Sequence, residues 1–308
     1  MRKNPAGRKF DFWTGVALPP LLAPLNLANL MKSHSILEHL AVCSWSLQPA
    51  SPEDLVEKLR ETGIRRVQLA LDPVRVSPKI WGGTGIVFRD HGITIVSGMV
   101  GCLGEDYSTL DSIRLTGGIA PDAKWEQNVK NIGACAAIAK KMGLKLVTFH
   151  AGFLPSDESH PAFAKMLQRL DVVADLFMKQ NILLGLETGQ ETATELAGLL
   201  HRLSHPNIGV NFDPANMLMY DKDDPVEALQ ILAPWIRQVH IKDARRTKIP
   251  GTWGEEVPVG TGEVDWRGFF STFKHAGLNV SLVIERESGD NRIGDIRAAR
   301  EAMKQTFI

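Results

Sequence analysis

Short apolar runs recur along the chain, and most are followed by segments in which apolar residues repeat at helical spacing. The runs, which we interpret as strands, cover residues 40–45, 66–70, 93–97, 145–150, 182–187, 208–213, 237–242 and 281–285. Strands that alternate with helices form a parallel sheet, and eight such units close a barrel, so the pattern predicts an α/β fold, a (β/α)8 TIM barrel. An open doubly wound sheet is the alternative, but no Gly-x-Gly-x-x-Gly motif follows the first run.

The segments between the runs carry signals for helix starts and ends. Ser51, followed by Asp54 three residues later, resembles a capping box, and Gly143 and Gly277 stand where two helices should end. Helices are therefore expected over 52–62, 126–142, 163–180, 192–203, 225–233 and 266–276. The one long irregular stretch, 100–124, follows the third strand, where a loop of a barrel lies over the mouth. We expect either a lid that contacts substrate or a plain surface insertion.

The first 35 residues do not follow this rhythm and are predicted to be an N-terminal extension to a barrel that spans 36–308. A basic start precedes a Leu-rich stretch that resembles an export signal, but Pro19, Pro20 and Pro24 interrupt it and no small-x-small cleavage site follows. A surface arm is the other interpretation. No later run is long and apolar enough to cross a membrane. We therefore expect a cytoplasmic protein, with export through the extension as the alternative.

Composition narrows the classes of partner. The chain has 44% hydrophobic and 23% charged residues, as in ordinary soluble proteins, and its 35 basic residues balance 35 acidic ones. Neither nucleic acid nor an anionic membrane is expected as a partner, because no overall positive charge would attract one. Cys43, Cys102 and Cys135 are widely spaced and odd in number, so they are interpreted as small buried side chains. A homo-oligomer is left open.

Five of the predicted strands end in polar side chains: His150, Glu187, Asp213, His240 and Glu285. The carboxyl ends of all barrel strands meet at one mouth, so these residues should lie close together. Burying three carboxylates in one place is costly unless a cation accompanies them. Two Glu, one Asp and one His suit Mn2+, Mg2+, Co2+ or Zn2+. We therefore expect one divalent metal ion on Glu187, Asp213, His240 and Glu285.

The alternation of side chains along a strand supports this arrangement. Gln238, His240 and Lys242 share one face of the seventh strand, and Asn211 shares a face with Asp213 on the sixth. We expect these faces to point into the barrel.

Several stretches resemble the xylose-isomerase-like barrel superfamily, and within it the sugar phosphate isomerase/epimerase group. They are LGLETGQET, VNFDPANML, QVHIKDARR, VPVGTGEVDW and LVIERE. The resemblance implies the same four metal ligands, and it implies that Glu187 and Glu285 are also the acid/base pair. The implied activity is a metal-dependent isomerase or epimerase acting on a sugar or sugar phosphate. It would remove the proton next to a carbonyl and pass through a metal-stabilised enediolate.

Other members of the superfamily leave alternatives. A dehydratase acting on a keto-polyol would use the same four ligands, and a sugar-binding barrel without activity is a third hypothesis. DNA-repair endonucleases of this fold bind three zinc ions through additional histidines. One of those histidines stands where this chain has Asn216. A trinuclear site is therefore not expected, which agrees with the balanced charge.

The remaining candidates concern the substrate. His150 is expected to bind a substrate hydroxyl or act as a further base, with a structural role as the alternative. Asn216 either orients substrate or forms a turn after Pro214. Lys242 and Arg246 are expected to hold a hydroxyl-rich or phosphorylated substrate, and Arg246 matches the substrate arginine of the family. Asp243 is a candidate ion-pair partner for Arg246.

Two further features are weaker. The glycines of VPVGTGEVDW would let backbone N–H groups approach an anion. Trp45, Trp81 and Trp253 are candidates for an apolar wall against a sugar ring, although packing elsewhere is the alternative for each.

Overall fold

Eight parallel strands close into a barrel, as the sequence predicts. The computed structural model describes residues 36–306, without the Leu37 side chain, so the expectations for residues 1–35 lie outside the described residues. Each strand pairs with the next along the chain, and the last pairs with the first, which excludes the open sheet. The strands are β1 (Leu40–Cys43), β2 (Arg66–Ala70), β3 (Thr94–Met99), β4 (Leu146–Phe149), β5 (Leu183–Glu187), β6 (Ile208–Phe212), β7 (Ile236–Ile241) and β10 (Ser281–Ile284).

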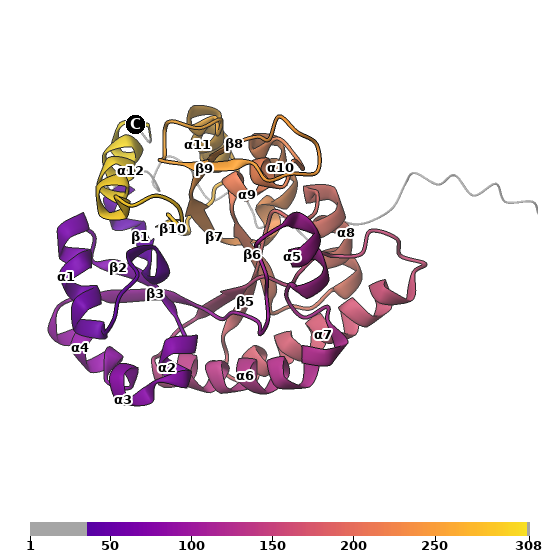
Figure 1. Cartoon of the computed structure of the whole chain (residues 1–308), viewed down its shortest axis with the longest axis horizontal. Coiled ribbons are helices and arrows are strands. Elements are labelled where there is room, and N and C mark those ends of the chain that lie inside the picture. Colours follow the sequence, from indigo (N-terminus) through magenta and orange to yellow (C-terminus); the bar gives the residue numbers. More distant parts are fainter. Residues whose placement is uncertain (1–35, 307–308) are drawn as a thin grey trace, which may run out of the picture. The chain divides into compact units, whose positions relative to one another are not determined.

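Helices follow the strands and lie around the barrel (Figure 1). The longer ones are α1 (Pro52–Thr62), α6 (Asp122–Lys141), α7 (Pro161–Met178), α8 (Ala193–Leu203), α10 (Pro225–Leu232), α11 (Trp266–His275) and α12 (Arg292–Thr306). Shorter ones are α2 (Asp72–Val76), α3 (Pro78–Trp81), α4 (Thr84–Asp90), α5 (Leu110–Thr116) and α9 (Pro214–Met219). All six predicted helices are present, with ends that differ by a few residues. Within residues 36–306 no helix has both the length and the apolar character that a membrane crossing needs.

Local sequence signals shape these elements. The Ser51 side chain accepts a hydrogen bond from the backbone N–H of Asp54 and so caps α1. Gly63 ends the same helix with a φ of 71°, a left-handed conformation that glycine adopts without strain. Leu55 and Leu59 are fully buried and attach the helix to the barrel.

The structure adds elements that were not predicted. Residues 100–124 are not a plain loop, because they contain α5, whose capping box is made by Thr109 and Ser112. After β7 the chain forms an antiparallel hairpin of β8 (Asp243–Arg245) and β9 (Glu255–Val257). Strands of three residues are too short to show a period in sequence. The helix α12 was also missed.

The interior of the barrel holds a connected set of polar side chains. Gln68 Nε2 donates to Thr148 Oγ1 over 2.7 Å, Ser97 Oγ donates to Gln238 Oε1 over 2.6 Å, and Gln238 Nε2 donates to Asn211 Oδ1 over 3.1 Å. All five residues are fully buried. The interior of such barrels is usually filled with branched aliphatic side chains. The polar set confirms that Asn211 and Gln238 point inward, and its amide groups contact the site above it.

The three cysteines are free, as expected, and Cys43 and Cys135 are buried while Cys102 is half-buried.

Candidate active site

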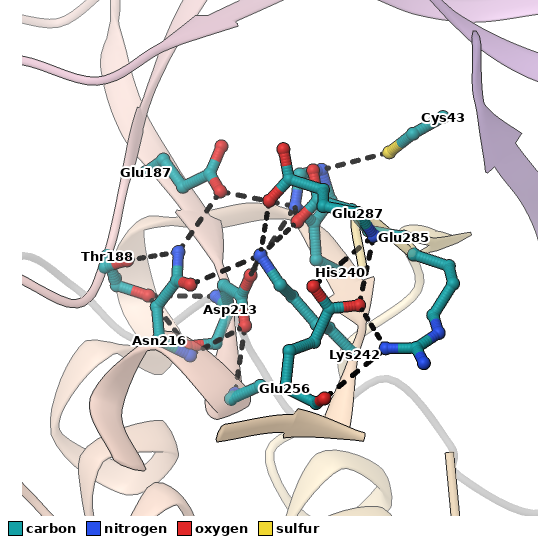
Figure 2. A network of polar contacts seen from close by, with 12 residues as sticks. Cys43, Glu187, Thr188, Asp213, Asn216, His240, Lys242, Glu256, Glu285 and Glu287 are labelled. Atoms are coloured by element: carbon teal, nitrogen blue, oxygen red, sulfur yellow. Dashed lines mark hydrogen bonds and ion pairs between the residues drawn. The ribbon is translucent and has the colours of Figure 1, made fainter. Parts of the chain in front are cut away.

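Four side chains from neighbouring strands converge at the mouth of the barrel (Figure 2). Glu187 ends β5, Asp213 follows β6, His240 lies near the end of β7, and Glu285 follows β10. All four are buried, and one ligand atom from each lies within 4.8 Å of the others. The structure therefore brings together the set that the strand ends suggested.

His240 stands at the centre of this cluster. Its Nδ1 lies 3.3 Å from Glu187 Oε1, 3.4 Å from Glu285 Oε2 and 3.8 Å from Asp213 Oδ2. Its Nε2 lies 2.8 Å from Gln68 Oε1. Asn211 Nδ2 lies 3.1 Å from the same Nε2. With a metal bound, an Nε2–H donating to the Gln68 oxygen would leave the lone pair of Nδ1 for the ion, so the buried amide of Gln68 fits the neutral form of the ring that a metal needs.

The two carboxylate oxygens of Asp213 have different surroundings. Oδ1 accepts from the backbone N–H groups of Ala215 at 2.8 Å and Asn216 at 3.0 Å, and so caps α9. Oδ2 is buried, and among the described residues it has no hydrogen-bond partner, which is also true of His240 Nδ1. Buried polar atoms without partners are rare in proteins and need an explanation. A divalent ion held by three carboxylates and one imidazole fits both atoms.

Lys242 adds a positive charge beside the cluster. Its Nζ lies 2.9 Å from Glu285 Oε2 and 2.8 Å from Glu287 Oε2. Burial opposes ionisation of Glu285, but Lys242 and His240 outweigh it and hold the pKa of the carboxyl well below its ordinary value. Burial likewise opposes the charge of Lys242, but Glu285 and Glu287 hold the pKa of its amine well above the usual range. Both groups are therefore charged at neutral pH.

The two remaining carboxyls of the cluster differ in their environment. Burial disfavours the charge of Glu187, but His150 and His240 more than compensate, so its pKa lies below the ordinary value. Burial raises the pKa of Asp213 despite the nearby Lys242 and His240. Glu187 and Glu285 are thus the stronger candidates for ionised bases, while Asp213 has the greatest need of a cation.

A cavity of about 970 Å³ opens above the cluster. The predicted substrate residues His150, Asn216 and Lys242 line it together with Glu285. His150 Nε2 lies 3.5 Å from Glu187 Oε1, and Asn216 Nδ2 lies 3.3 Å from the same oxygen. Each of these side chains thus faces both the cavity and a candidate ligand.

The aromatic side chains take different roles. Trp45 lines the cavity, and its indole N–H donates to Glu285 Oε1 over 2.8 Å. Trp253 also lines the cavity and packs against Tyr220, with ring centroids 4.9 Å apart. Trp81 is buried and is not among the lining residues. The stretch 100–124 contributes Gly101, Glu105 and Tyr107 to the lining, in agreement with a substrate-contacting loop.

Arg246 lies apart from these residues. Its guanidinium pairs with Asp221 Oδ1 at 2.9 Å and donates to the carbonyl of Asp223, and it is not among the residues that line the cavity. Its role as a substrate residue stays a prediction. The proposed ion pair between Arg246 and Asp243 is wrong. The Asp243 carboxylate instead accepts hydrogen bonds from the backbone N–H groups of Gly260 and Gly262.

Some residues of the site were missed from sequence. Glu287 lies two residues after Glu285, just beyond β10, so extending the alternation of that strand would have placed it near the cluster. Glu256 and Arg286 line the cavity as a pair, with 2.8 Å between Oε1 and Nη1, but no local pattern marks them. Gln68 was not predicted either, because a single Gln inside a short strand does not by itself indicate a role in a site.

The chain has detectable relatives. A model of the xylose isomerase-like TIM barrel family matches residues 43–306. The solved structure of a xylose isomerase domain protein from Planctomyces limnophilus is 26% identical, covers 87% of this chain and 96% of its own, and superposes with a TM-score of 0.77.

Two curated relatives have named activities. A 3-dehydroshikimate dehydratase from Bacillus anthracis is 28% identical over 130 residues, or 41% of this chain and 46% of the relative. An L-ribulose-5-phosphate 3-epimerase from Salmonella paratyphi C is 25% identical over 198 residues, or 61% of this chain and 66% of the relative. The matched parts thus span less than two thirds of either relative.

Proposed function

This chain belongs to the xylose isomerase-like TIM barrel family, and we propose that it is a divalent-metal-dependent enzyme that isomerises or epimerises a keto sugar. The observation that carries the proposal is the pair of buried atoms Asp213 Oδ2 and His240 Nδ1, for which the described residues offer no hydrogen-bond partner. They stand between Glu187 and Glu285, next to a cavity of about 970 Å³. Such a site combines a place for a cation with two carboxylates, of which Glu285 lines the cavity and Glu187 contacts the lining residues His150 and Asn216.

The four ligands would be Glu187, Asp213, His240 and Glu285, and their mixed oxygen and nitrogen donors suit Mn2+, Mg2+, Co2+ or Zn2+. Bound there, the ion would supply Lewis-acid polarisation of a substrate carbonyl, which acidifies the neighbouring C–H group.

Glu187 and Glu285 would move the protons. Both carboxyls are ionised at neutral pH, as a general base requires. His240 lies near both, but their other contacts differ, since His150 and Asn216 contact Glu187 while Trp45 and Lys242 contact Glu285. Two such bases suit an epimerase, in which one carboxylate removes a proton from one face of the carbon and the other, after taking up a proton from solvent, delivers it to the opposite face.

The cavity residues would hold the sugar. His150, Asn216 and Lys242 carry polar atoms within reach of both the cavity and the glutamates. In this proposal they bind the hydroxyl groups of the substrate and fix the carbon whose proton is removed. Arg246 would join them only if its pairing with Asp221 opened.

A dehydratase is the second candidate, favoured by the resemblance to the 3-dehydroshikimate dehydratase. The first step, removal of a proton next to a carbonyl, would be the same. The outcomes differ because a dehydratase then expels a hydroxyl group from the adjacent carbon.

The test is turnover of a panel of ketoses in D2O by protein loaded with Mn2+. We expect deuterium at the carbon next to the carbonyl, and Glu187→Gln and Glu285→Gln should each lower kcat by about 10²–10⁴-fold, the usual contribution of a positioned acid or base. Glu227→Gln, which changes an exposed carboxyl on α10 outside the cavity, should leave kcat unchanged.

Each other outcome has a definite meaning. If the substrate loses water during turnover, the proposed activity becomes that of a dehydratase rather than an epimerase. A Gln variant that retains metal and near-normal turnover makes that glutamate a ligand only, and His150 becomes the next candidate base. Ketose binding without any exchange of protons would favour the non-enzymatic sugar-binding barrel.

A further inference from the structure

We propose that the cavity accepts an uncharged keto sugar and excludes the phosphorylated form of the same sugar. This inference rests on the proposed function, whose substrate class it narrows. It is carried by the charges that line the cavity and by the hydrogen bonds of the two loops where a phosphate would bind.

Carboxylates outnumber cations among the charged residues that line the cavity. Six of them contribute to it, namely Asp72, Glu105, Glu255, Glu256, Glu285 and Glu287. Among residues 36–306 the lining contains only two Lys or Arg side chains, so the charge of this part of the lining stays negative even when a divalent ion is added. A phosphate group carries nearly two negative charges at neutral pH and would be repelled.

Neither cation of the lining is available to a phosphate. Lys242 is already paired with Glu285 and Glu287, at 2.9 and 2.8 Å. Arg286 is paired with Glu256 and Asp295, both at 2.8 Å. A phosphate would have to displace two carboxylates from either side chain.

The backbone donors after the seventh barrel strand are occupied as well. Barrels of this type often bind phosphate with the loops that follow strands seven and eight. Here Gly260 N and Gly262 N donate to Asp243 Oδ2, at 2.8 and 3.2 Å, and Val264 N donates to Asp243 Oδ1 at 3.2 Å. A Cβ added at Gly262 would lie 2.1 Å from Asp243 Oδ1, so the loop closes tightly around this carboxylate. The side chain of Asp243 thus stands where the glycines would otherwise receive an anion.

The loop after the eighth strand, β10, shows the same arrangement. The backbone N–H of Glu287 donates to Glu256 Oε1 over 2.9 Å, and Ser288 Oγ donates to Glu256 Oε2 over 3.1 Å. A second internal carboxylate therefore uses the donors of this loop.

The volume of the cavity does not account for the proposed exclusion of a sugar phosphate. At about 970 Å³ the cavity lies near the upper end of the range of roughly 300–1,000 Å³ found for small-molecule sites. A sugar phosphate would fit, so charge has to make the distinction. Carboxylates accept strong hydrogen bonds from hydroxyl groups, and Trp45, Tyr107 and Trp253 offer apolar surface, which together suit a neutral polyhydroxy compound.

The experiment compares each ketose with its terminal phosphate on the Mn2+-loaded protein, by kcat/KM and by calorimetric Kd. We expect a preference of about a hundredfold or more for the free sugar, in keeping with the cost of like charges at close range. The preference should shrink as salt is raised, because ions screen the repulsion. Inorganic phosphate alone should not compete with the free sugar.

Two charge-reversal variants make the test specific to the cavity. Glu255→Lys, in the lining, should reduce the preference at least several-fold, whereas Glu227→Lys makes the same change of net charge outside the cavity and should leave it unaltered. Equal effects of the two variants would overturn the inference.

The outcomes also separate this inference from the proposed function. Faster conversion or tighter binding of the phosphate would overturn the inference and leave the function standing. No conversion of any ketose, with a retained preference in Kd for the neutral sugar, would remove the function and support the inference. Binding of neither form would overturn the inference.

Discussion

Oδ2 of Asp213 lies 3.8 Å from Nδ1 of His240, and within the described residues neither atom has a hydrogen-bond partner. The opposite side of each group is fully engaged, since Asp213 Oδ1 caps α9 and His240 Nε2 faces Gln68. The two side chains are therefore fixed by contacts that leave Asp213 Oδ2 and His240 Nδ1 facing the cluster. This arrangement makes the proposed metal site testable separately from the stability of the fold.

Asp213→Asn should separate metal binding from helix capping. Asn is as good an N-cap as Asp, so the variant should unfold close to the wild type in the absence of metal, whereas Asp213→Ala should lose about 1 kcal/mol more. Both variants should lose the roughly one divalent ion per chain expected for the wild type, because a four-ligand site would lack one charged ligand. Elemental analysis and urea unfolding of the same samples measure the two effects. Three zinc ions per wild-type chain would contradict the single-ion site.

Gln68 should control metal affinity without touching the metal. Gln68→Leu removes the acceptor that orients His240, and losing such a partner typically lowers metal affinity by about 10–100-fold. Gln68→Glu keeps an acceptor oxygen at the same reach and should retain more of the affinity. Competition titration with a chelator gives both constants. Equal losses in the two variants would show that packing, rather than the hydrogen bond to His240, sets the affinity.

Glu191 should make stability depend on pH. Burial, helped by the charge of Glu195, raises the pKa of this carboxyl to about 8. Between its ordinary value and 8 the folded chain keeps a proton that the unfolded chain has lost, so stability is present at low pH and falls as pH rises through this range. Each tenfold difference in proton affinity between the folded and unfolded chains is worth about 1.4 kcal/mol, so the fall should be on the order of a few kcal/mol.

The measurement is urea unfolding of wild type and Glu191→Gln at pH 5 and pH 8.5. The Gln variant mimics the protonated carboxyl, so it should lose less stability over the same range. Parallel loss in both proteins would assign the pH dependence to other groups.

The strands and the convergence of the four candidate ligands could be predicted because barrel geometry converts a position in sequence into a position in space. A polar side chain at the end of each apolar run, as at Glu187 and Glu285, is enough once the strand ends are known to meet. The partners of the loops could not be predicted in this way. Asp243 contacts glycines some twenty residues away rather than Arg246, because the hairpin β8–β9, which the sequence did not reveal, sets the path of the chain.

Helix α12 was missed for a different reason. Its buried residues Ile296, Ala299 and Met303 form a thin stripe among charged side chains. Such a stripe is a weak helical signal, although it suffices for packing against the closed barrel.

The four candidate ligands all lie on β5, β6, β7 and β10 or directly after them, on four adjacent strands from the second half of the chain. The first half instead supplies much of the cavity wall, including Trp45, Tyr107 and His150. A chimaera that exchanges residues 100–124 between two such barrels should therefore alter the wall that faces the substrate and leave the four candidate ligands in place.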